Sequence, residues 1–142
     1  MKAICRYSMG SAIPRSERYL REVDQTSYAP LKVGSEYRVY GLLFICGRMD
    51  FLVVPEESSP FWAPSSLFEI TDSGICNEWG VCSTKNNGQY HSLFASFNIT
   101  CIIGYRSLVD DYEHYRGLVE SDADHVERFF LENRNVSMSG AR

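Results

Sequence analysis

The sequence predicts an α+β fold: a strongly bent antiparallel sheet, or a small SH3-like barrel, of about six strands, followed by a C-terminal helical hairpin. Short apolar runs with strand-like composition fill residues 37–103. Turn signals such as Asn87-Gly88 separate these runs. After residue 104 the apolar period changes from two to 3.6, which is typical of amphipathic helices.

The longest apolar run, Tyr37–Cys46, has two largely apolar faces, so we expect a central strand covered on both sides. Gly41 in its middle indicates a bend or bulge. Phe51–Val54 is expected to return antiparallel. The prolines around Phe61–Pro64 exclude a regular central strand there and place Trp62 in a loop. The residues expected in the core are Tyr37, Val39, Leu43, Phe51, Val53 and Phe68.

The remaining strands are expected at Leu67–Thr71, Trp79–Thr84, Tyr90–Phe97 and Ile99–Ile103. The second and third of these flank the Asn-Gly signal and would form a hairpin.

Two helices follow. Apolar residues recur at helical spacing from Tyr105 to Val119, with Ser107 as the expected N-cap. A second helix is expected with Ser121 as its N-cap and with Arg128 and Arg134 toward its C-terminal end.

A length of 142 residues is typical of one domain. We expect a single domain over residues 31–134, a partly ordered extension over residues 1–30 with two helical turns in Ser16–Val23, and a disordered tail over residues 135–142.

The formal charge of −4 argues against sequence-independent binding of nucleic acid, which needs a basic surface. Residues 1–36 carry +2, residues 37–104 carry −3 and residues 105–142 carry −3. This pattern fits either ordinary solubility or an acidic face for a basic partner.

The five cysteines include no Cys-x-x-Cys pair, and no signal peptide or membrane span is recognised, so we expect a cytoplasmic protein. No catalytic, cofactor-binding or metal-binding set is predicted, and the chain is not expected to be an enzyme. One enzymatic alternative is open, in which His114 acts with Asp110 or Glu113. The competing interpretation of that cluster is a solvated helix face.

Several segments between residues 33 and 120 share a recognisable order of core-type residues. They are Val33-Gly34-x-x-Tyr37-x-Val39-Tyr40-Gly41, Phe61-Trp62-x-Pro64-x-x-Leu67-Phe68-Glu69-Ile70-x-Asp72, Trp79, Gly104-Tyr105-x-x-Leu108-Val109 and Glu113-His114-Tyr115. Through these segments most of the chain resembles small bacterial immunity proteins that are encoded beside polymorphic or contact-dependent growth inhibition toxins. The resemblance implies stoichiometric binding of a cognate toxin domain, without catalysis, and it transfers no contact residue.

We therefore expect an immunity protein, with no direct contact to membrane or nucleic acid, whose toxin is encoded by the adjacent gene and acts in the cytoplasm, for example as a nuclease. The alternative is an SH3-like adaptor that binds a peptide through Phe61, Trp62 and Trp79. The residues expected to contact the partner are one loop aromatic and a set of acidic residues: Trp62, Glu56, Glu57, Asp110, Asp111, Glu113, Glu120, Asp122 and Asp124.

Overall fold

The computed structural model describes residues 1–19, 21–56 and 58–140, with side chains up to residue 134. Within these residues the chain forms two antiparallel sheets, with strand orders β2-β1-β6 and β5-β4-β3-β8-β7. The strands are β1 (Lys2–Cys5), β2 (Glu36–Arg38), β3 (Gly41–Ile45), β4 (Arg48–Val53), β5 (Phe61–Pro64), β6 (Phe68–Asp72), β7 (Gly80–Ser83) and β8 (Ile99–Gly104), and the α-helices are α1 (His91–Phe97), α2 (Arg106–Asp110), α3 (Tyr112–Val119) and α4 (Ala123–Gly140).

The predicted α+β class with antiparallel sheets and helices at the C-terminal end is therefore confirmed. The described strands form two sheets where the sequence predicted one bent sheet or a barrel, and neither of these sheets closes on itself. None of the described helices has the length and apolar character needed to span a bilayer.

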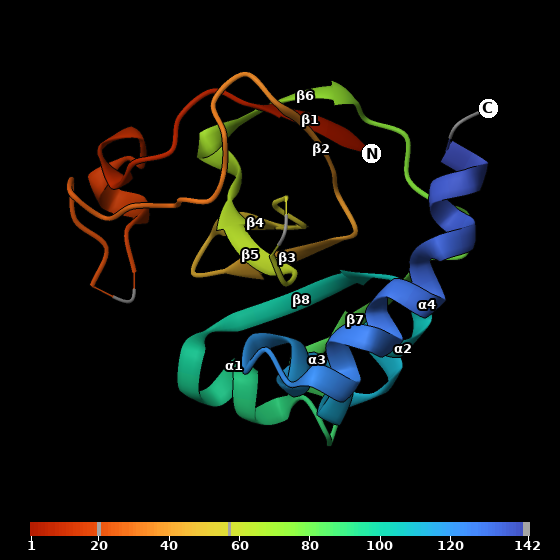
Figure 1. Ribbon diagram of the computed structural model, residues 1–142. Helices are drawn as coiled ribbons and strands as arrows, with labels where there is room; N and C mark the ends of the chain where they lie inside the picture. Colours follow the sequence, from red (N-terminus) through yellow and green to blue (C-terminus); the bar gives the residue numbers. More distant parts are fainter. Residues whose placement is uncertain (20, 57, 141–142) are drawn as a thin grey trace.

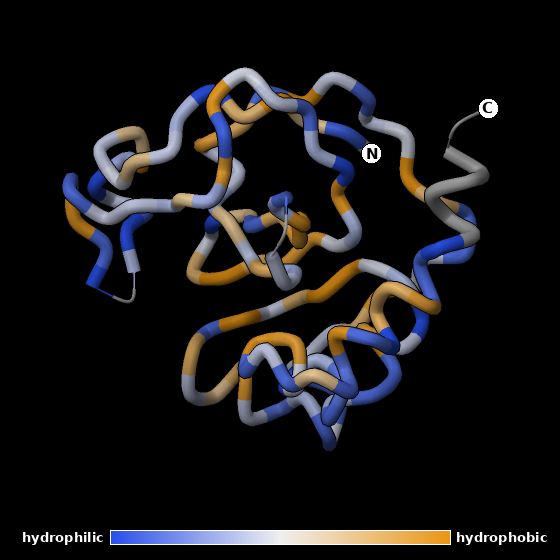
Figure 2. Tube along the Cα trace, viewed as in Figure 1, coloured by the Kyte–Doolittle hydropathy of each residue, from blue (hydrophilic) through white to orange (hydrophobic). Residues whose placement is uncertain are grey.

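The elements are arranged in layers (Figure 1). The three-stranded sheet lies at the top, strands β3, β4 and β5 lie in the middle, and α1, α2, α3 and the start of α4 lie below, while the rest of α4 rises along the right side. One apolar cluster fills the space between the sheets, and a second lies between the five-stranded sheet and the helices. The central strands are accordingly among the most hydrophobic parts of the tube in Figure 2.

Strand β3 lies in the centre of the five-stranded sheet, between β4 and β8, and is covered on both faces as predicted. The expected continuous strand Tyr37–Cys46 is nevertheless interrupted at Val39–Tyr40, where the chain passes from one sheet to the other. This break changes the side-chain alternation: Tyr37 and Val39 share their cluster with Leu42, and not with Leu43 as regular alternation predicted.

The first strand was not expected. β1 lies between β2 and β6, and its Ala3 and Cys5 are fully buried. The helical turns expected in Ser16–Val23 are not found in the described part of that segment, which contains only a 3-10 turn at Arg15–Glu17. The division into extension, domain and tail stays a prediction.

The expected strand Tyr90–Phe97 is wrong, because His91–Phe97 forms helix α1. The Asn87 side chain accepts hydrogen bonds from the backbone N–H groups of Gln89 and Tyr90, so the Asn-Gly turn leads into a helix and not into a return strand. Asn98, with φ of 54°, ends this helix in the left-handed conformation.

The first predicted C-terminal helix is divided into α2 and α3 at Asp111, whose extended backbone and side chain cap α3. Ser107 lies inside α2 and is not its N-cap. Before α4, the side chain of Asp122 accepts from the backbone N–H groups of Asp124 and His125, so the capping side chain is Asp122 and not Ser121.

Candidate functional site

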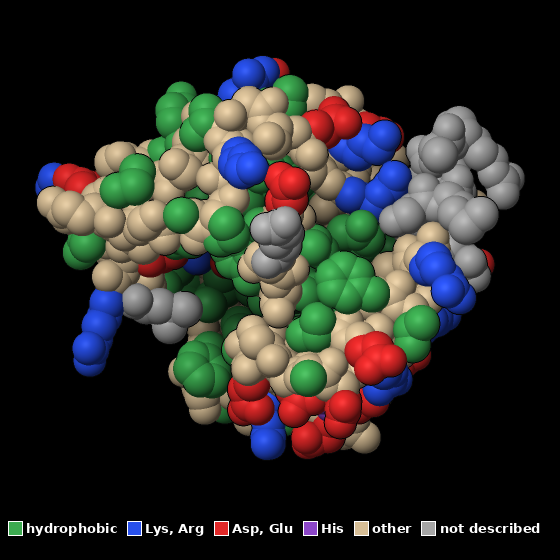
Figure 3. All heavy atoms as spheres, in the orientation of Figure 1, with side chains coloured by type: hydrophobic (Ala, Val, Ile, Leu, Met, Phe, Trp, Pro, Cys, Tyr) green, Lys and Arg blue, Asp and Glu red, His purple; other side chains and the backbone are tan. Residues whose placement is uncertain are grey.

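A cleft of about 420 Å³ opens between the middle strands, the N-terminal segment and the C-terminal end of α3. Figure 3 shows the hollow between the N-terminal segment on the left and the helical layer below it. The residues that line it are Glu22, Thr26, Tyr28, Leu43, Ile45, Arg48, Asp50, Leu52, Pro60, Phe61, Trp62, Pro64, Ile99, Tyr115, Leu118, Val119 and Ser121.

One end of the cleft contains a buried ionic cluster around Arg48, whose side chain is 3% exposed. Arg48 donates to Asp50 with two parallel bonds, Nε to Oδ1 at 2.8 Å and Nη2 to Oδ2 at 3.1 Å. Its Nη1 donates to Glu22 Oε1 at 2.5 Å. One guanidinium is thus shared between two carboxylates, which leaves the cluster with a net charge of −1 when all three groups are ionised.

Aromatic hydroxyl groups and rings support this cluster. Tyr28 donates to Glu22 Oε2, and the ring of Tyr19 lies 5.1 Å from the Arg48 guanidinium carbon. Burial and the bond to Glu22 raise the pKa of Tyr28, so it stays a donor. Burial alone would raise the pKa of Glu22. The hydrogen bonds from the Arg48 guanidinium, the Tyr19 backbone N–H and the Tyr28 hydroxyl outweigh burial and hold this pKa below its ordinary value.

The pKa of Asp50 is raised because burial outweighs the two bonds from Arg48. The two carboxylates thus differ: Glu22 accepts three hydrogen bonds, whereas Asp50 accepts two, and burial of Asp50 is incompletely compensated. Asp50 is the part of the cluster with the most to gain from an additional positive charge.

The walls of the cleft are aromatic and aliphatic. Trp62 lies on edge strand β5 and packs against Tyr115 of α3, with ring centroids 6.5 Å apart. Leu118 is buried in the wall, whereas Val119 at the mouth is 57% exposed. The cleft therefore presents an apolar channel that ends at charged groups.

The structure places Trp62 in an edge strand and not in the loop that the sequence predicted, which agrees with the rule that proline confines a strand to an edge. Trp62 is half-buried, and its ring lies against Gly41, where a Cβ atom would be 3.3 Å from the indole. The indole Nε1 is buried without a hydrogen-bond partner among the described residues.

The acidic residues expected at the partner surface lie over α2, α3 and the start of α4. Residues 106–127 contain seven acidic and two basic residues, a net charge of −5. Asp110 and Glu120 pair with exposed arginines on their own helices, and Asp111 and Asp122 cap helices. Glu113 and Asp124 are exposed. In Figure 3 acidic side chains gather along the lower side of the molecule, where these helices lie.

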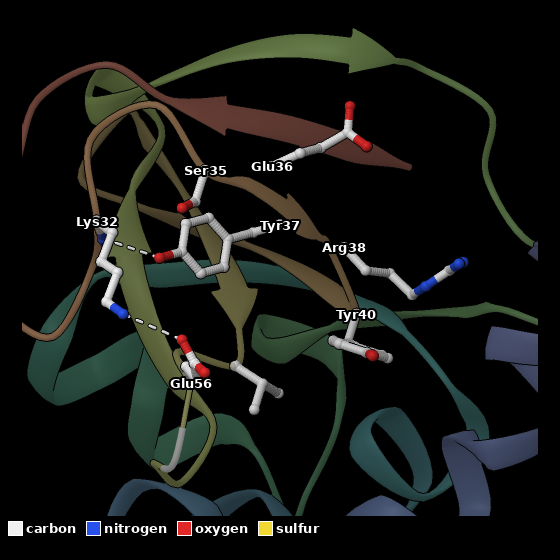
Figure 4. A pocket seen from close by; sticks show the side chains of 8 residues that line it. Lys32, Ser35, Glu36, Tyr37, Arg38, Tyr40 and Glu56 are labelled. Carbon is white, nitrogen blue, oxygen red and sulfur yellow. Dashed lines mark hydrogen bonds and ion pairs between the residues drawn. The ribbon is translucent and has the colours of Figure 1, made fainter.

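Glu56 belongs to a different surface. Its carboxylate pairs with Lys32 at 3.0 Å, and both side chains are well exposed, so the pair is weak. Figure 4 shows this pair beside Tyr37, whose hydroxyl accepts from the Lys32 backbone N–H, in a separate hollow of about 310 Å³. Glu57 lies outside the described residues.

His114 does not face Asp110 or Glu113. It is fully buried, its Nε2 lies 2.7 Å from the Tyr105 hydroxyl, and its Nδ1 lies 3.2 Å from Nδ1 of His125. Burial, with Arg128 and His125 nearby, lowers the pKa of His114 to about 4. His114 is therefore a neutral part of the packing between α3 and α4. Among the described residues, no group of three or more His, Cys, Asp or Glu side chains is arranged to hold a metal ion.

Sequence reasoning did not single out Glu22, Arg48 and Asp50. One signal was available: Arg48 and Asp50 occupy alternate positions of a strand and share a face with the buried Leu52. Charged residues on a core-facing strand need partners or a function. No sequence signal connects Glu22 to them.

Comparison with known proteins adds no identification: no family model, no curated protein and no solved structure matches this chain.

Proposed function

We propose that this chain is an immunity protein that neutralises a cognate bacterial toxin domain by stoichiometric binding. The observation that best supports the proposal is the acidic surface of residues 106–127, which adjoins an apolar cleft through Leu118, Val119 and Ser121. Protein interfaces commonly combine a central apolar anchor with a charged rim. The sequence resemblance supplies the class of partner.

In this proposal the toxin acts in the cytoplasm, and so does the protein that neutralises it. A nuclease is a fitting partner because its substrate surface is basic. An acidic surface accelerates encounter with such a surface and excludes wrong partners. Glu113 and Asp124, which are exposed and have no ion-pair partner among the described residues, would contribute most to the attraction.

Co-expression with the product of the adjacent gene tests the proposal. The expected result is that the neighbouring product is toxic, and that this chain protects the cell and forms a 1:1 complex with it. A neighbour without toxicity, or a chain that neither binds nor protects, would contradict it.

The contribution of the acidic surface can be measured separately. The double variant Glu113→Lys and Asp124→Lys should slow association by about tenfold at low salt, and the difference should shrink as salt is added. Asp72→Lys on β6, exposed in the other sheet, is the control for Glu113→Lys alone, since each changes the net charge by +2, and it should leave the association rate nearly unchanged.

A second candidate is an adaptor that binds a proline-rich peptide. Of the three aromatic residues expected from the sequence, Phe61 and Trp62 line one cleft, together with Tyr115, whereas Trp79 is not among the lining residues. Aromatic grooves of this kind receive proline-rich ligands. In this alternative, β1 to β6, which contribute to one shared apolar core, act as a small SH3-like barrel. Titration with a proline-rich peptide library separates the two candidates, because an immunity protein should bind none of its members.

A further inference from the structure

The cleft contains a carboxylate with unused acceptor capacity. An ionised carboxylate accepts about four hydrogen bonds. Asp50 accepts two, one on each oxygen and both from Arg48. Glu22 accepts three, from Arg48, Tyr19 and Tyr28. A donor that enters the cleft would therefore find its free acceptor positions chiefly on Asp50.

The sign of the charge in the cleft favours a positive donor. Among the described residues that line the cleft, Arg48 is the one basic residue, and it is already shared between Glu22 and Asp50. When all three groups are ionised, a cation that approaches Asp50 from the cleft meets a net charge of −1. The Asp50 side chain is largely buried, and charge interactions are stronger there than at the surface.

The walls suit the rest of a basic side chain. Arginine and lysine carry apolar stems that pack on hydrophobic surface, and their charged ends are attracted to aromatic faces. Trp62, Phe61 and Tyr115 provide aromatic wall, and Leu118 and Val119 provide aliphatic wall toward the mouth. An apolar channel that ends at a carboxylate matches this shape of ligand.

We propose that the cleft binds the guanidinium or ammonium group of a basic side chain, presented by the protein partner and directed at Asp50. The identity of the partner rests on the proposed function, whereas the chemistry of the site rests on the cleft alone. The exposed acidic residues Glu120 and Asp122, next to the mouth at Val119 and Ser121, would guide the incoming charge.

The test uses the full chain and a small probe. Nα-Acetyl-L-argininamide (argininamide below), whose guanidinium is its sole charge, is titrated to millimolar concentration while the indole N–H signal of Trp62 and the backbone signals of β4 and α3 are followed by NMR. Nα-Acetyl-L-citrullinamide (citrullinamide below) has nearly the same shape without the guanidinium charge and is the matched control. Nα-Acetyl-L-leucinamide (leucinamide below) tests the apolar channel. The expected result is saturable shifts at the cleft with argininamide and at least about tenfold weaker binding of citrullinamide.

Variants locate the site. Asp50→Asn should weaken argininamide binding by about tenfold, because a charge-assisted bond is replaced by a neutral one. Since Asp50 also supports Arg48, a second pair avoids the core: Val119→Glu should strengthen binding severalfold and Val119→Lys should weaken it to a similar degree. Val119 is exposed, so both variants should fold. Asp72→Asn, an exposed position on β6 in the other sheet, should change little.

Three results would overturn the inference: equal binding of argininamide and citrullinamide, equal or tighter binding of leucinamide, or equal affinities of the two Val119 variants. Each of these would leave the proposed function standing if the chain still protects against its toxin. Conversely, charge-dependent binding of argininamide with no protection would support the site and remove the toxin as its partner.

Discussion

Stability should fall steeply between pH 7 and pH 5 because of one residue, His114. Its side chain is fully buried between Tyr105 and His125, and its pKa in the folded protein is lowered to about 4 from an ordinary value of 6.5. In the unfolded chain His114 takes up a proton below pH 6.5, whereas the folded protein does so only near pH 4. The unfolded state binds more protons in this window, so the free energy of unfolding rises with pH.

The size of the effect follows from the two pKa values. At pH 7 the residue is neutral in both states and contributes almost no pH dependence. At pH 5 the difference amounts to about 2 kcal/mol, and below pH 4 it approaches about 3 kcal/mol. The groups that face His114 are Tyr105, His125, Arg128, Glu132 and Asp111. Burial is the largest cause of the lowered pKa of His114, so exposing this imidazole to water should weaken the pH dependence of stability most.

Urea unfolding at a series of pH values between 5 and 7 measures the effect. His114→Gln removes the titrating group, so its stability should depend on pH less steeply than that of the unmodified chain, and the two curves should converge as the pH falls. His91→Gln, an exposed position on α1, is the control and should keep the original slope. Parallel curves for His114→Gln and the unmodified chain would show that this residue is not a neutral buried histidine, and the reasoning would be refuted.

Three further perturbations test the packing. Arg48→Met should destabilise the fold by about 3 to 5 kcal/mol, because two buried carboxylates lose their shared partner; urea unfolding measures it, and a loss below about 1 kcal/mol would contradict the buried cluster. Gly117→Ala should cost several kcal/mol or force α3 and α4 apart, because the added Cβ would lie 2.2 Å from the His125 ring; an unchanged melting temperature would count against the helix contact. Tyr90→Phe should cost about 1 kcal/mol through loss of its 2.7 Å bond to the Leu108 carbonyl, with the same measurement.

Much of the fold could be predicted from the sequence where the pattern is local. The apolar faces of β3 and β4 identified the central strands, and the change of period identified the helices at the C-terminal end. The helix at His91–Phe97 could not be predicted this way, because polar and apolar residues alternate only weakly in this segment. Its placement also depends on a distant contact, the hydrogen bond from the Tyr90 hydroxyl to the Leu108 carbonyl. β1 is a similar case, since four residues at the chain terminus become a central strand only through pairing with β2 and β6.

The site was only partly accessible to sequence reasoning for the same reason. Trp62 was singled out by its proline neighbours, which do place it at a sheet edge. Its neighbour in the cleft, Tyr115, lies on α3, where the helical pattern alone does not distinguish a cleft residue from a core residue. Glu22 comes from a segment without regular structure. Clefts of this kind form where segments distant in sequence come into contact, and local periodicity in the sequence does not predict such contacts.

The ionic cluster has an energetic implication for function. Burying Arg48 with Glu22 and Asp50 removes three charges from water, and such clusters are commonly no more stabilising than apolar residues of the same volume. Stability alone therefore gives little reason for charged residues at positions of β4 that share a face with the buried Leu52. The incompletely compensated carboxylate of Asp50 destabilises the free protein. A bound cation would compensate this charge, and the free energy gained would appear as binding affinity. For this reason the variants at Val119, which change the charge at the mouth without touching the cluster, are the most direct way to separate a binding site from a packing arrangement.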